Sequence, residues 1–201
     1  KIDMVEPELV SIAEEDVRDF LKGTFLENAP IVPVSAITGE GIENFKKILF
    51  SLLNQVQPKS TKGIFRMPVQ RVFSKHGHGT CITGIQVSGN IAIGDTIEIL
   101  PGGYKGRIKK IQAYGSDVEE ASAGHSTSLN VKDINPEKVA RGQLAVSPGY
   151  FGEAHFIEGK FTYLKRMKNA LEHLTPIRFH TGTVEEIGKV TIIGQESLNP
   201  G

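Results

Sequence analysis

The spacing of apolar residues changes near residue 63. Before that point apolar residues recur every three or four positions, as on one face of a helix, whereas after it they alternate with polar residues, as in β-strands. The stretch between these patterns, residues 58–64, is polar and begins with Pro58, which is typical of a boundary between domains. The sequence therefore predicts an α/β segment over residues 1–57 and an all-β part over residues 65–201.

The first segment has the pattern helix, strand, turn, helix. Pro7 suits the first turn of a helix, residues 29–34 form an apolar run typical of a buried strand, and Gly39 and Gly41 mark a turn before a second helix. This order predicts the closing part of a parallel α/β sheet, whose ligands bind beyond the carboxyl ends of its strands. The two apolar stripes consist of Leu9, Ala13, Val17, Phe20 and Leu21, and of Ile42, Phe45, Leu49, Leu52, Leu53 and Val56.

Two short fragments of this segment have the chemistry needed to recognise guanine. The Asp3 carboxylate can accept the N1–H and the exocyclic amine of guanine together, a paired geometry that adenine does not offer. The aliphatic part of Lys1 can lie across the base, and the backbone N–H after Ser35, that of Ala36, can donate to the guanine O6. Lys-x-Asp is a common tripeptide that also suits a solvated lead-in to a helix, and its spacing to Ser35 and Ala36 favours the guanine site.

A phosphate-binding loop is missing from these 201 residues. No Gly-x-x-x-x-Gly-Lys-Ser/Thr sequence occurs, so we expect neither a phosphate cradle nor a magnesium site here. Hydrolysis and catalytic residues therefore cannot be assigned to this chain, which we expect to be a fragment of a larger protein.

The all-β part predicts a small closed barrel over residues 65–150 and part of a second β unit over residues 151–201. Short alternating strands divided by glycine-rich turns are typical of such barrels. Strands are predicted over residues 65–73, 80–88, 96–100, 106–113 and 126–131 of the barrel, and over 158–164, 176–180 and 188–193 of the second unit.

Charge and cysteine content narrow the class of protein. The chain has 23 basic and 23 acidic residues, but residues 1–57 carry 5 basic and 10 acidic groups, whereas residues 58–150 carry 12 and 7. A single cysteine, Cys81, excludes an internal disulfide framework, and no apolar run reaches membrane-spanning length. We therefore expect a cytoplasmic protein without a membrane partner, whose basic barrel can contact a phosphate backbone.

The six histidines show no metal-ligand spacing, so no metal site is predicted. His76 and His78 flank Gly77 and fit a hairpin tip better than a zinc site, because no cysteine pair or carboxylate cluster accompanies them. His180 and Cys81 lie in predicted strands and fit packing roles.

Many elements of the chain resemble, in order and spacing, the second domain of translational GTPases. They are Arg71-Val72-Phe73, Gly77-His78-Gly79-Thr80, Thr83-Gly84, Ser88-Gly89, Gly94-Asp95, Ile111-Gln112, Ala123-Gly124 and Arg141-Gly142. Within that superfamily the segments 111–115, 118–121 and 128–130, together with 179–183, Val190 and 198–201, most resemble the selenocysteine-specific elongation factors, with elongation factor Tu as the nearest alternative.

This resemblance implies a fold and a function. The fold would be the C-terminal end of a P-loop GTPase α/β domain followed by two translation-factor β-barrels, the last incomplete. The function would be that of a carrier, which in its full-length form binds GTP or GDP with Mg²⁺, binds an aminoacyl-tRNA, and delivers it to the ribosome.

The resemblance also implies a cationic pocket for the aminoacyl group in the second domain. A selenol is largely ionised near neutral pH, whereas the serine hydroxyl is not, so a cationic pocket separates the two. Of the charged residues that the family would place there, only Arg71 matches. Gln70 occupies the acidic position, and Ser126, beside His125, stands where a further arginine is expected, so the pocket either uses other groups or takes another aminoacyl ligand.

Further cations of the barrel are candidates for contact with the tRNA backbone or belong to a solvated outer face. Strict alternation predicts that Arg107 and Lys109 share one face and Lys110 the other, and that Gln70 and Arg71 point to opposite faces. The candidates are Arg66, Arg71, Lys75, Arg107, Lys109 and Lys110.

Two hypotheses follow. In the first, the chain is part of a translational GTPase, whose cargo is selenocysteinyl-tRNA or, as in elongation factor Tu, a general aminoacyl-tRNA. In the second, it is a non-hydrolytic module whose barrel binds RNA or protein without a nucleotide.

Overall fold

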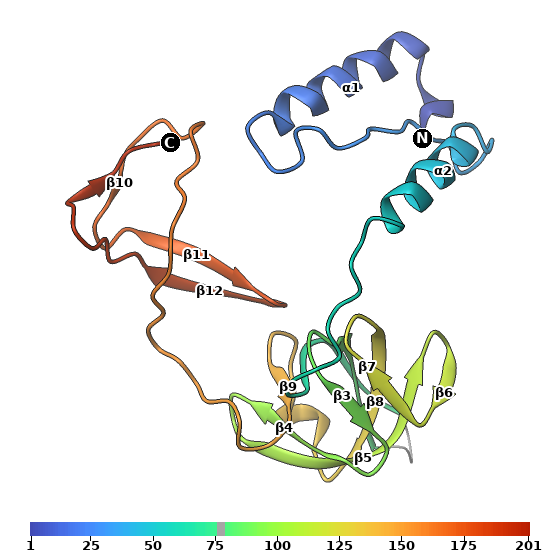
Figure 1. The fold of residues 1–201 in the computed structure, drawn as a ribbon, viewed down its shortest axis with the longest axis vertical. Helices are drawn as coiled ribbons and strands as arrows, with labels where there is room; N and C mark the ends of the chain where they lie inside the picture. The colour runs from blue at the N-terminus through green and yellow to red at the C-terminus, as the bar shows by residue number, and fades with distance from the viewer. Residues whose placement is uncertain (76–78) are drawn as a thin grey trace. The chain divides into compact units, whose positions relative to one another are not determined.

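The computed structural model describes residues 1–75 and 79–201, apart from the side chain of Lys75. The chain divides into two compact units, Lys1–Gln57 and Pro58–Gly201. Figure 1 shows that the first unit is helical and that the second is built of strands. No helix among the described residues has the length and apolar content needed to cross a bilayer.

The first unit contains the 3-10 helix η1 (Ile2–Met4) and the helices α1 (Pro7–Leu21) and α2 (Ile42–Leu53). Both predicted helices are confirmed, although α2 ends at Leu53 and leaves Val56 outside it. The predicted strand over residues 29–34 is wrong, because this run is extended but not paired, and no strand is present in the described residues 1–57. A strand needs a hydrogen-bonded neighbour, and this unit offers none. Because this unit has no sheet to cover them, the apolar stripes of both helices remain exposed, as at Leu9 and Leu52.

Six antiparallel strands of the second unit form a closed barrel (Figure 1). Their order is β4-β9-β1-β2-β8-β5, and the pairing of β4 with β5 closes the ring. The short strand β6 extends from β5, and β3 pairs with β7 beside the barrel. The six strands are β1 (Arg66–Lys75), β2 (Gly79–Ile85), β4 (Thr96–Leu100), β5 (Tyr104–Ala113), β8 (Ser126–Lys132) and β9 (Leu144–Val146), and the shorter ones are β3 (Asn90–Ala92), β6 (Ser116–Val118) and β7 (Glu120–Ser122).

The barrel interior is filled by the apolar residues of the alternating pattern. Successive residues of β2 and β8 are buried and at least partly exposed in turn, as strand geometry requires. Burying these side chains, each contributing about 1.5–3 kcal/mol, is the main stabilisation of the barrel. The fully enclosed members include Met67, Val69, Ile82, Ile97, Ile99, Ile111, Leu129 and Val131.

The last fifty residues form two small antiparallel pairs, β10 (Leu171–Glu172) with β13 (Ser197–Leu198) and β11 (Pro176–Thr181) with β12 (Val184–Lys189). The predicted strand over residues 158–164 is absent, and the one predicted over 188–193 lies at 184–189 instead. The hairpin turn explains this shift. Thr181 pairs with Val184, so the second strand begins directly after Gly182 and Thr183.

Candidate functional sites

The first candidate site joins the two fragments predicted to recognise guanine. The backbone nitrogen of Lys1 donates a 2.8 Å hydrogen bond to the Val34 carbonyl, and the Ile2 N–H donates to the same oxygen at 3.3 Å. Residues thirty-odd positions apart in the sequence are thus neighbours. The chain end that carries Asp3 lies against the segment that leads into Ser35 and Ala36.

Ser35 stabilises the loop of this site by hydrogen bonds. Its side chain is buried, and its hydroxyl oxygen accepts hydrogen bonds from the Ile37 and Thr38 N–H groups, both at 3.2 Å. Its backbone N–H donates to the Glu40 carbonyl at 3.0 Å. Ser35 therefore holds the loop rather than offering its hydroxyl to a ligand.

The groups left for a ligand are the exposed Asp3 carboxylate and the Ala36 N–H, which donates no hydrogen bond among the described residues. Gly41 closes the loop at the start of α2 with a φ of 73°, and a Cβ there would lie 2.1 Å from the Pro33 carbonyl oxygen. Only glycine fits this approach. The arrangement suits a planar base that carries donors and an acceptor along one edge, and guanine binding stays a prediction.

The second candidate site is on the outer face of the barrel, where strand β1 has a bulge. Val69 pairs with Gly84 and Arg71 with Thr83, so Gln70 is an extra residue on β1. The predicted opposite orientation of Gln70 and Arg71 is wrong, because a bulge breaks the alternation and both side chains are exposed. Gln70 and Arg71 can therefore face the same ligand.

Ser126 and Arg71 lie on this same outer face. Ser126 pairs with Ile85 and Ser128 with Thr83, which is also the partner of Arg71. Strand spacing and rise place the Cα atoms of Arg71 and Ser126 roughly 12 Å apart. The surface between them carries the hydroxyl groups of Thr83 and Ser128, so a cation and several hydroxyls can surround a small anionic group.

His125 precedes Ser126 and contacts Tyr114, a residue that the sequence analysis did not single out. The Tyr114 hydroxyl and His125 Nδ1 are 2.6 Å apart, and the two rings meet edge to face with centroids 5.4 Å apart. Tyr114 is 77% exposed and has a φ of 53°, in the turn that joins β5 to β6. The contact of Tyr114 with His125 depends on the pairing of β5 with β8, which joins segments distant in the sequence.

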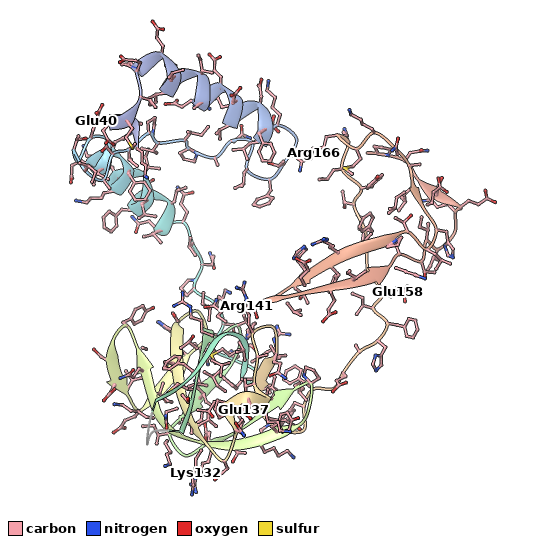
Figure 2. All side chains as sticks on the ribbon, turned by 180° about the vertical axis from the view of Figure 1, so that it is seen from behind. Glu40, Lys132, Glu137, Arg141, Glu158 and Arg166 are labelled. Atoms are coloured by element: carbon pink, nitrogen blue, oxygen red, sulfur yellow. The ribbon has the colours of Figure 1, made fainter. Side chains whose placement is uncertain are left out.

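The basic candidates do not all gather at this site. Arg107 pairs with Lys132 at the other end of the β5–β8 ladder, six residues from Ser126 along β8, or about 20 Å. Its Nε atom donates to the Gly94 carbonyl at 2.8 Å, which ties part of the guanidinium to the barrel. Lys132 and Arg141 project from opposite ends of the barrel (Figure 2).

The prediction that Lys109 and Lys110 lie on opposite faces is wrong, because β5 has a second bulge. Ile108 pairs with Val131 and Lys110 with Asn130, so Lys109 is the extra residue and both lysines are exposed. Arg66 is exposed on β1. Lys75 ends β1, and its side chain, like His76 and His78, lies outside what the structure describes.

Lys110 is engaged by a carboxylate. Its Nζ atom is 2.7 Å from Asp117 Oδ2, and Gln112 Nε2 donates to Asp117 Oδ1 at 2.8 Å. The hydrogen bond from Lys110, followed by that from Gln112, lowers the pKa of the Asp117 carboxyl below its ordinary value. Lys110 is therefore less available to a phosphate than Arg71 or Lys109.

No cluster of three or more His, Cys, Asp or Glu side chains suited to a metal ion occurs in the described part of the chain. Cys81 is half-buried, and its Sγ accepts a 3.4 Å hydrogen bond from Asn130 Nδ2.

Comparisons with known proteins bear on the fold and the family of the chain. Residues 79–146 match the family model of elongation factor Tu domain 2. The selenocysteine-specific elongation factor of Desulfomicrobium baculatum is 36% identical over all 201 residues, which cover 32% of its length. The chain corresponds to a region of the selenocysteine-specific elongation factors.

Solved structures show the same fold. A crystal structure of a bacterial selenocysteine-specific elongation factor matches 98% of this chain with a TM-score of 0.74 at 30% identity, and the match covers 33% of that protein. The Methanococcus maripaludis elongation factor SelB in complex with the GTP analogue GppNHp matches 98% of the chain with a TM-score of 0.68 at 24% identity, over 48% of its length. The chain spans about a third to a half of the relatives it matches. The predicted fold class is confirmed, because the chain has two helices followed by the elongation factor Tu domain 2 barrel and further β-sheet.

Proposed function

We propose that this chain is the part of a translational GTPase that binds aminoacyl-tRNA, with selenocysteinyl-tRNA as its cargo, and that the full-length protein delivers this tRNA to the ribosome in the cytoplasm. The observation that carries the proposal is the match to the bacterial selenocysteine-specific factor over 98% of the chain. The outer face of the barrel supports it, because the Gln70 bulge presents Arg71 beside the hydroxyls of Thr83 and Ser128.

The nucleotide part of the proposal rests on the first site. In this proposal Asp3 and the Ala36 N–H read the edge of guanine, while the phosphates and Mg²⁺ are bound by other parts of the full-length protein. A relative crystallised with a GTP analogue supports GTP as the nucleotide.

A general aminoacyl-tRNA carrier is the second candidate function. The match of residues 79–146 to elongation factor Tu domain 2 favours it, as do Gln70 and Ser126 at positions where charged residues were expected. In a non-hydrolytic binding module, by contrast, RNA binding would not depend on the nucleotide.

The test is nucleotide-dependent binding. The full-length protein is incubated with selenocysteinyl-tRNA and either GTP or GDP, and spontaneous hydrolysis of the aminoacyl ester is followed over time. A carrier shields the ester with GTP but not with GDP. Equal hydrolysis rates with GTP, with GDP and without protein would refute the proposal.

A further inference from the structure

The tip of the β11–β12 hairpin contacts strand β1 immediately before the Gln70 bulge. The Thr183 hydroxyl donates a 2.7 Å hydrogen bond to the Val69 carbonyl, across 114 residues of sequence. The Gly142 N–H donates to the same carbonyl at 3.1 Å, while the Val69 N–H donates to the Gln143 carbonyl at 2.8 Å. Both polar groups of the Val69 backbone are thus satisfied from outside β2.

The fit around this contact is close. Gly142 has a φ of 98°, and a Cβ there would lie 3.2 Å from the Val184 side chain, so its lack of a side chain lets Val184 approach. A Cβ on the turn residue Gly182 would lie 3.3 Å from the Pro68 ring. Thr183, Val184 and Gly182 therefore pack on Pro68, Val69 and Gly142, and we call these six residues the clasp.

The clasp acts on the peptide plane that leads into the bulge. The Val69 carbonyl belongs to the planar peptide group that joins Val69 to Gln70, so a hydrogen bond that holds this oxygen also orients the Gln70 nitrogen. The bulge interrupts the pairing with β2 at this point, because Gln70 is the extra residue. The ladder alone therefore defines the backbone here less well than in the rest of the strand.

We propose that Thr183 is a positioning residue, which fixes the bulge through the Val69 carbonyl and so sets the orientation of Arg71 on the outer face of the barrel. The inference rests on the proposed function only in naming aminoacyl-tRNA as the ligand of Arg71. Thr183 touches no ligand in this account, and its effect on binding passes through Arg71.

The first test needs no ligand. Amide hydrogen exchange of residues 69–72 is compared in the wild-type chain, Thr183→Val, Thr183→Ser and Thr175→Val. Thr175 is a matched control, because its hydroxyl donates an equally short 2.7 Å bond, but to the nearby Glu172 carbonyl. We expect exchange about fivefold faster in Thr183→Val, wild-type rates in Thr183→Ser, and no change at these residues in Thr175→Val. Unchanged exchange in Thr183→Val would overturn the proposal, whatever the protein binds.

The second test is a double-mutant cycle in the full-length protein, with the Kd of selenocysteinyl-tRNA measured in the presence of GTP. If Thr183 acts through Arg71, Thr183→Val weakens binding in the wild-type background but adds nothing to Arg71→Ala. Additive losses would overturn the positioning role. A wild-type protein that fails to bind the tRNA would refute the proposed function instead, while leaving the exchange result to decide the clasp.

Discussion

Arg71 lies opposite Thr83, whereas Val69, two residues earlier, lies opposite Gly84, the next residue of β2. This single extra residue turns Gln70 and Arg71 to the same, exposed side of the barrel. A cationic group and an amide are thus available to one ligand, which regular alternation would have prevented.

Arg71→Ala should weaken binding of selenocysteinyl-tRNA more than that of seryl-tRNA, because the guanidinium favours an anionic selenolate over a neutral hydroxyl. Binding isotherms for both tRNAs over a range of salt concentrations measure this difference. Arg107→Ala is the control, since Arg107 lies at the other end of the ladder and should affect both tRNAs alike. Equal losses in Arg71→Ala, with a salt slope lower by about one, would make Arg71 a phosphate contact.

Asp3→Asn in the full-length protein should weaken GTP binding by a few kcal/mol and shift the preference towards xanthosine triphosphate. The mutation exchanges one acceptor for a donor, which matches the C2 oxygen of xanthine and leaves guanine with an unpaired donor. Competition between the two nucleotides measures the shift, with Glu6→Gln as a nearby control. Undiminished GTP binding would show that Asp3 is only a lead-in to α1.

Gln86→Met should destabilise the barrel by roughly 1–3 kcal/mol. The buried Gln86 Nε2 donates to the Gly89 carbonyl at 2.7 Å and to the Ala121 carbonyl at 3.2 Å, so the mutation leaves both acceptors without this donor. Urea unfolding of Gln86→Met and of the exposed control Gln70→Met gives the comparison. Similar urea midpoints for the two variants would mean that the Gln86 hydrogen bonds make no net contribution to the stability of the barrel.

Lys110→Gln should raise the pKa of Asp117 towards its ordinary value, because the hydrogen bond from Lys110 is the main cause of its lowering. A carboxyl whose folded pKa is lowered stabilises the fold above its unfolded pKa of about 3.9, and this contribution is lost as the pH falls through the folded pKa. An NMR titration of Asp117 measures the change. The adjacent Lys109→Gln should leave the Asp117 pKa as it is, and an equal rise in both variants would contradict the assigned ion pair.

Elements that depend on local residue patterns could be predicted from the sequence, whereas features that depend on strand pairing could not. Helices α1 and α2 and the long barrel strands follow from apolar spacing, and strand β4 has the predicted bounds. The bulges at Gln70 and Lys109 could not be predicted, since each is defined by the register of a distant strand. Three-residue strands such as β3 and β9 are too short to show a period.

The candidate sites divide in the same way. The residue types at Asp3 and Arg71, and the spacing from Asp3 to Ser35, indicated binding chemistry. The structure brings Lys1 to Val34, so the two predicted guanine fragments are neighbours. The contacts of Tyr114 with His125 and of Thr183 with Val69 join segments whose proximity only the fold determines.

The most direct test of the central claim is the affinity of the full-length protein, with GTP, for one tRNA carrying either selenocysteine or serine. The account predicts tighter binding of the selenocysteinyl form by at least about tenfold, which is roughly 1.4 kcal/mol. Equal affinities for the two forms would contradict it and would leave the barrel as the aminoacyl-binding domain of a general carrier.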